Sequence, residues 1–129
     1  MLLNQVIGIV GLLVHTQVTM LYKFKSKVTG DLIMLEPNGR QILQLIDKGD
    51  AASLVKGILV PPEMPAAIAA LERAVAEDDA AQQQRLQEAK AAGEKLPRPE
   101  TVSLRQRAVP FIEMLKRCHQ ADMEVVWGV

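Results

Sequence analysis

Two arginines lie in the first turn of a predicted helix, where a chain can build an anion-binding site. Ser103 is followed three residues later by Gln106, which is the pattern of a helix capping box. Arg105 and Arg107 follow this start, although the partial positive charge of a helix N-terminus disfavours cations there. The free N–H groups of the first turn and one guanidinium group could hold a phosphate or a carboxylate together. The candidate anion site therefore comprises Ser103, Arg105 and Arg107.

The same two arginines have a simpler interpretation. They bond carboxylates such as Glu100 or Asp31, or they extend into solvent. Residues two apart on a helix point to different sides, so at most one of Arg105 and Arg107 serves any single ligand. The sequence leaves the anion site and ordinary charge pairing open.

Other reactive residue types lack the spacing that catalysis or metal binding needs. Cys118 and His119 are adjacent, and helix neighbours are about 100° apart, which disfavours a nucleophile–base pair. Cys118 lies on an apolar stripe and is interpreted as a packing residue. The acidic run 77–79 is interpreted as a solvated helix face, and His15 and His119 lack metal-ligand neighbours. We therefore nominate no catalytic residue, no metal and no cofactor, and find no phosphate-loop, serine-elbow or zinc-protease motif.

Three lysines alternate with apolar or small residues near the start of the charged part of the chain. Lys23, Lys25 and Lys27 form one face of a predicted strand, opposite Tyr22 and Phe24. Single-strand nucleic-acid sites usually place aromatics and cations on the same accessible surface. The lysines are therefore expected to form a solvated face that discourages edge aggregation, and the aromatics to lie in the core.

Composition narrows the class of protein. The chain has 129 residues, of which 49% are hydrophobic and only 3% aromatic, which predicts one domain with a mostly aliphatic core. The net charge is zero, which disfavours a dedicated nucleic-acid binder. A single cysteine cannot form a disulfide within the chain. We expect a cytoplasmic protein, with nucleic acid and membrane disfavoured as partners.

The first nineteen residues differ from the rest, because all 15 basic and 15 acidic residues follow them. A secretory signal would need a positive n-region, which is absent. A membrane-spanning helix would need about 20 apolar residues, and the uninterrupted run covers only 6–14. We favour a mis-called start codon, with Met20 as the natural beginning. The expected domain is 20–129, and 1–19 is an extension outside the core.

The apolar spacing predicts an alternation of strands and helices. Strands are expected at 22–27 and 31–35, joined as a hairpin at Gly30, and at 123–128. A short helix is expected to begin at Asn38 and to end near Gly49, with 50–59 a linker that could hold a short extended piece. A long helix follows Pro61 and Pro62 and ends at Gly93. Its stripe of large apolar residues nearly vanishes after Val75, so the second half is expected to project into water. The last helix begins at Ser103, and Pro110 should kink or restart it.

These elements predict an α+β fold. In the order β-β-α-α-α-β, a small three-stranded antiparallel sheet would carry the helices on one face, with the final strand beside the first. One shared interior should bury Phe24, Leu71, Phe111 and Trp127.

Three segments, "MLYKFKSKVTGDLIML", "MPAAIAALERAV" and "SLRQRAVPFIEMLKR…VVWG", resemble a bacterial family known as the domain of unknown function eighteen-forty. The resemblance spans residues 20–129, and the extension 1–19 departs from it. It implies a small, stand-alone bacterial protein, and it implies no activity, cofactor or catalytic residue.

We therefore expect a non-catalytic protein-interaction or regulatory module, bound to a protein partner or to a second copy. The exposed half of the long helix and the free edge or outer face of the sheet are the expected contact surfaces. The alternative is a small-molecule anion or phosphate binder, or an enzyme, that uses the helix start at 103–107.

Overall fold

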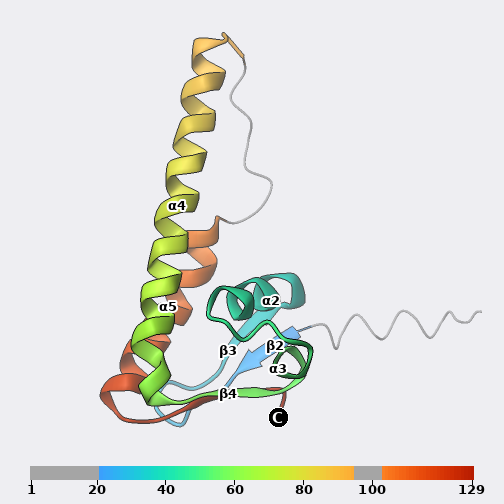
Figure 1. Cartoon of the computed structure of the whole chain (residues 1–129), viewed down its shortest axis with the longest axis vertical. Helices are drawn as coiled ribbons and strands as arrows, with labels where there is room; N and C mark the ends of the chain where they lie inside the picture. The colour runs from blue at the N-terminus through green and yellow to red at the C-terminus, as the bar shows by residue number, and fades with distance from the viewer. Residues whose placement is uncertain (1–20, 95–102) are drawn as a thin grey trace, which may run out of the picture.

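The computed structural model describes residues 21–94 and 103–129. These residues form strands, α-helices and one short 3-10 helix in the following order: β2 (Leu21–Phe24), β3 (Leu32–Leu35), α2 (Glu36–Leu45), α3 (Ala51–Val55), β4 (Gly57–Leu59), η2 (Pro61–Glu63), α4 (Met64–Ala91), α5 (Leu104–Gln120) and β5 (Val125–Trp127) (Figure 1). The α+β class is confirmed. The N-terminal extension lies outside the described residues.

The expected three-stranded sheet is wrong, because the strands form two antiparallel pairs. β2 pairs with β3, with Leu21 opposite Leu35, and β4 pairs with β5, with Gly57 opposite Trp127. β4 lies in the linker 50–59, for which the sequence allows a short extended piece, and a three-residue strand that starts with glycine has almost no alternation to detect. The final strand therefore has β4, rather than β2, as its ladder partner.

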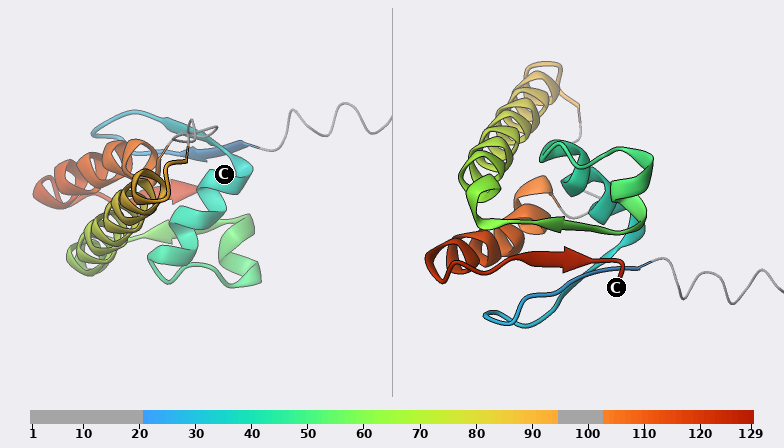
Figure 2. Two further views of the ribbon diagram at one scale, coloured as in Figure 1. Left: turned by 90° about the horizontal axis from the view of Figure 1, so that it is seen from above. Right: turned by 60° about the horizontal axis from the view of Figure 1, so that its bottom comes forward.

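A single bridge joins the two pairs. The backbone N–H of Lys25 donates to the carbonyl oxygen of Val126 at 2.8 Å, and the N–H of Val126 donates to Lys25 at 3.0 Å. Lys25 directly follows β2, so the first and last strands are neighbours, as expected. One residue pair joins them, however, and not a continuous ladder. Across the molecule the strands lie in the order β3, β2, β5, β4 (Figure 2).

The core lies where the inner faces of the strands meet α2, α4 and α5. Phe24 is central to it, with its ring centroid 4.8 Å from that of Phe111 and 5.8 Å from that of Trp127. These three residues and Leu71 are fully buried in one cluster, which confirms the shared interior. No polar or charged side chain is buried among the residues that the structure describes.

Two aromatic side chains also fasten α3 to this core. The hydroxyl of Tyr22 donates to the carbonyl oxygen of Leu54, and the indole Nε1–H of Trp127 donates to that of Ser53, each at 2.6 Å. A five-residue helix has few internal hydrogen bonds. Tertiary contacts from distant strands therefore hold α3 in place.

The short helix α2 differs from expectation at both ends. It begins at Glu36, directly after β3, with no side-chain cap on the N-cap residue Leu35 and with proline in its first turn. Asn38 therefore lies inside the helix and is not its cap. At the other end the helix stops at Leu45, before the expected end near Gly49, and Asp47 takes the left-handed conformation with φ of 66°.

The long helix α4 has two different halves. Its buried residues are Met64, Ala67, Leu71 and Val75, and no residue after Val75 is buried. Figure 1 shows the C-terminal part of α4 extending beyond the start of α5. The expected projection of this half is confirmed. Helix α5 is continuous through Pro110, so a restart at this proline is wrong.

Candidate functional site

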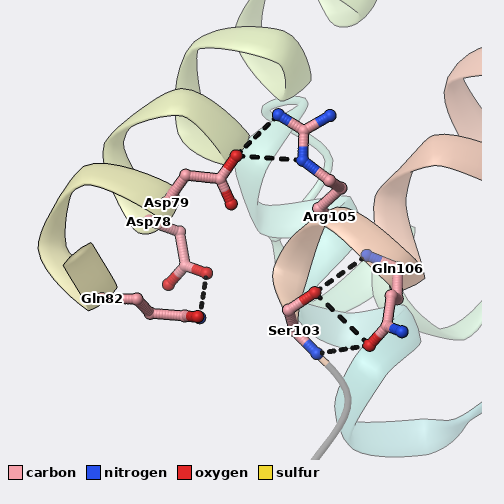
Figure 3. Close-up of polar contacts among 6 residues, drawn as sticks. All are labelled: Asp78, Asp79, Gln82, Ser103, Arg105 and Gln106. Carbon is pink, nitrogen blue, oxygen red and sulfur yellow. Dashed lines mark hydrogen bonds and ion pairs between the residues drawn. The ribbon is translucent and has the colours of Figure 1, made fainter. Parts of the chain in front are cut away.

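The start of α5 carries the capping box that the sequence predicts. The backbone N–H of Gln106 donates to Ser103 Oγ at 3.2 Å, and the N–H of Ser103 donates to Gln106 Oε1 at 3.1 Å (Figure 3). The hydroxyl group nominated for anion binding thus satisfies a backbone group of its own helix. This reciprocal bonding fixes where the helix begins.

Arg105 pairs with a carboxylate of the preceding long helix. Its Nε and Nη2 atoms donate to Asp79 Oδ2 at 2.9 and 2.6 Å (Figure 3). Carboxylate pairing was one of the two interpretations of this arginine, but the partner is neither Asp31 nor Glu100, and Glu100 lies outside the described residues. The contact joins the start of α5 to the middle of α4.

Arg107 points to a different part of the molecule. It is half-buried, and its Nη2 donates to Gln41 Oε1 on α2. The expectation that the two arginines point to different sides is confirmed, since they contact α4 and α2 respectively. The fold therefore does not bring both guanidinium groups to one ligand position.

A groove between α4 and α5 runs beside Arg105. Its lining combines two acidic, two basic and three aliphatic residues: Glu72, Val75, Arg105, Val109, Ile112, Glu113 and Lys116. Lys116 Nζ lies 3.4 Å from Glu72 Oε2 across the groove. The opposite charges balance, so the groove offers no excess of positive charge to an anion.

The β2–β3 hairpin exposes an aliphatic surface that sequence reasoning missed. Tyr22 and Phe24 point into the core, as predicted, whereas Leu21 is 49% exposed, Ile33 54% and Leu35 61%. Leu21 lies opposite Leu35 in the ladder, and Ile33 lies opposite Lys23. We call Leu21, Ile33 and Leu35 the outer patch. The available signal was the run 32–35, which is apolar at every position and therefore supplies apolar side chains to both faces of its strand.

Of the remaining candidate residues, Cys118 packs in the core as predicted, whereas two residues of the acidic run, Asp78 and Asp79, are half-buried and bonded to other side chains instead of forming a solvated face. Cys118 is fully buried, with its Sγ 3.1 Å from Ser26 Oγ, whereas His119 is exposed. In the acidic run, Asp78 accepts from Gln82 Nε2 at 2.9 Å and Asp79 binds Arg105 (Figure 3). Within residues 21–94 and 103–129, no three His, Cys, Asp or Glu side chains gather as metal ligands would. In the same residues, no helix has both the length and the apolar character for crossing a bilayer.

Comparison with known proteins identifies a family. The model of a family described as "Domain of unknown function (DUF1840)" matches residues 20–127. Neither the curated proteins nor the solved structures contain a match.

Proposed function

The chain belongs to the DUF1840 family, and we propose that within it the protein is a cytoplasmic, non-catalytic protein-interaction module. Its contact surface comprises the outer patch and the exposed half of α4. A partner that covers these surfaces would leave the buried cluster undisturbed, so binding needs no unfolding of the domain.

The outer patch carries this proposal. Single exposed aliphatic residues are common on protein surfaces, but three on adjacent strands form one apolar area. Each side chain is about half exposed, so covering it with a partner would contribute about 1 kcal/mol. Lys23 borders the patch on the same face and supplies the polar rim that protein interfaces usually have.

The exposed half of α4 supplies a second type of surface. Residues 77–91 contain both acidic and basic side chains, and their large apolar residue Leu86 is 38% exposed. A charged helix of this kind, which we call the arm, orients a protein partner and raises the rate of association more than it raises the affinity. The arm therefore complements the outer patch.

Native mass spectrometry of the protein purified from its own cells tests this function. We expect complexes heavier than one chain in the wild type, and their loss in Ile33→Lys. Val55→Lys is the matched control, because Val55 is 75% exposed on α3, outside the outer patch. A wild type that is a bare single chain even at about 500 µM protein, or complexes equally abundant in Ile33→Lys, would contradict the proposal.

The alternative is a small-molecule anion binder or enzyme that uses Ser103, Arg105 and Arg107. Arg105 is exposed and within reach of solvent anions, although an added anion would compete with the Asp79 carboxylate. Phosphate should then raise the melting temperature of the wild type, and should raise that of Arg105→Ala or of Arg107→Ala less, since one of the two arginines serves the ligand. Equal stabilisation of all three proteins would exclude the alternative.

A further inference from the structure

Strand β3 forms one outer edge of the strand order. Its ladder partner is β2, and within the described residues no strand pairs with its other side. An edge strand presents a row of backbone N–H and C=O groups that can pair with another strand. Natural edges are commonly protected by charged residues or proline, and β3, with the sequence LIML, contains neither.

We propose that β3 pairs antiparallel with β3 of a second copy of this chain, forming a twofold dimer. This inference rests on the proposed interaction function and names its partner. Because a twofold axis relates the two strands, one surface suffices for both sides of the interface.

The side-chain directions restrict how the two strands can align. Directly opposite residues of antiparallel strands point to the same side of a sheet, so the twofold axis must lie at a residue and not between two residues. The two residues in the middle of β3 are Ile33 and Met34, and an axis at either one pairs most of the strand. With the axis at Ile33, the two copies of Ile33 meet. With the axis at Met34, Ile33 meets Leu35 of the second copy. In both registers an exposed aliphatic side chain of one chain covers an exposed aliphatic side chain of the other.

The charges around the patch permit this self-pairing. β3 contains no charged residue, and the whole chain has a net charge of zero. Lys23 lies one strand away from the edge, opposite Ile33. With the axis at Ile33 the two Lys23 side chains are three strand spacings apart, about 14 Å, which exceeds the screening length of about 8 Å at physiological salt. A second copy therefore meets an apolar edge without like-charge repulsion.

The small size of the outer patch limits the expected affinity of the dimer. A stable dimer commonly buries about 20–30 residues on each side, and the outer patch with the four residues of β3 is much smaller. The dimer should therefore be weak, with a dissociation constant of about 10 to 100 µM.

Sedimentation velocity over a concentration series of the full chain measures this equilibrium. We expect the wild type and Val55→Lys to shift from monomer to dimer between about 1 and about 500 µM. Ile33→Lys should stay monomeric, because it places a charge beside the axis. A wild type that stays monomeric throughout would overturn the inference, as would equal dimerisation of Ile33→Lys.

Oxidative cross-linking gives an independent measurement of the same contact. The double variant Ile33→Cys, Leu35→Cys should form a disulfide-linked dimer in either register, whereas Val55→Cys should not. The native Cys118 is buried and does not compete. Cross-linking no faster than that of Val55→Cys would overturn self-pairing. If the complexes from cells are nevertheless lost in Ile33→Lys, another protein occupies the patch and the interaction function stands, whereas unchanged complexes contradict the interaction function itself.

Discussion

Gly57 lies opposite Trp127 in the β4–β5 ladder, and the indole ring occupies the space that a side chain at position 57 would fill. A Cβ atom on Gly57 would lie 2.7 Å from Cε2 of the ring. The ring cannot easily move away, because its Nε1–H donates to the carbonyl oxygen of Ser53. Glycine is therefore required here by close approach, and the same contact joins β4, β5 and α3.

Gly57→Ala is expected to destabilise the protein by about 1–3 kcal/mol, the usual range for overpacking a core contact. Urea unfolding measures the change. Combining it with Trp127→Phe should give a smaller loss than the sum of the two single changes, because the smaller ring makes room for the methyl group. Strict additivity would show that the clash with the indole is not the cause.

The Tyr22 hydroxyl should titrate above its ordinary value of 10.0. Burial raises the pKa of Tyr22, Arg40 opposes this shift, and Glu36 adds to it. Since the folded state holds the phenol proton more tightly, its contribution to stability is complete below pH 10 and falls as the pH rises above the unfolded value. Tyr22 is the single tyrosine of the chain, so ultraviolet absorbance of the phenolate follows this group alone. A midpoint at or below 10 in the folded protein would contradict the expectation.

Glu63 should contribute stability that acid removes. The Val60 N–H, which donates to its Oε1 at 3.0 Å, lowers the pKa of Glu63 below its ordinary value of 4.5, and Lys48 lowers it further. A depressed carboxyl pKa means that the contribution is complete above pH 4.5 and disappears as the pH falls through the folded value.

Glu63→Gln should therefore lower the free energy of unfolding at pH 7 by less than about 1 kcal/mol, since the side chain is partly exposed. The difference from the wild type should shrink at pH 3, where the wild-type carboxyl is also protonated. Urea unfolding at the two pH values measures it, and a difference that stays constant would contradict the assignment.

The two halves of α4 should respond differently to the same substitution. Leu71→Ala removes a fully buried side chain and should cost about 2–5 kcal/mol. Leu86→Ala, in the exposed half, should change the free energy of unfolding by no more than about 0.5 kcal/mol. Chemical denaturation of both variants measures the contrast, and similar costs would show that the exposed half contributes to the core.

Features that depend on neighbours along the chain can be predicted from the order of the amino acids. The Ser103–Gln106 cap joins residues three apart, and the stripe that ends at Val75 follows from helical spacing. The alternation of Tyr22 and Phe24 with lysines predicted which side of β2 faces the core. Each of these features involves residues within a few positions of one another, so the spacing of residue types is enough to predict it.

Contacts between residues far apart in the chain depend on how the helices and strands pack together. Arg105 binds Asp79, which lies 26 residues away, and neither carboxylate named from the sequence is its partner. β4 became a strand because β5 pairs with it and the indole of Trp127 covers Gly57, not through its own propensity. The exposure of the outer patch also depends on tertiary packing. In a strand that is apolar at every position, only the packing of the helices decides which side chains are buried and which are left for a partner.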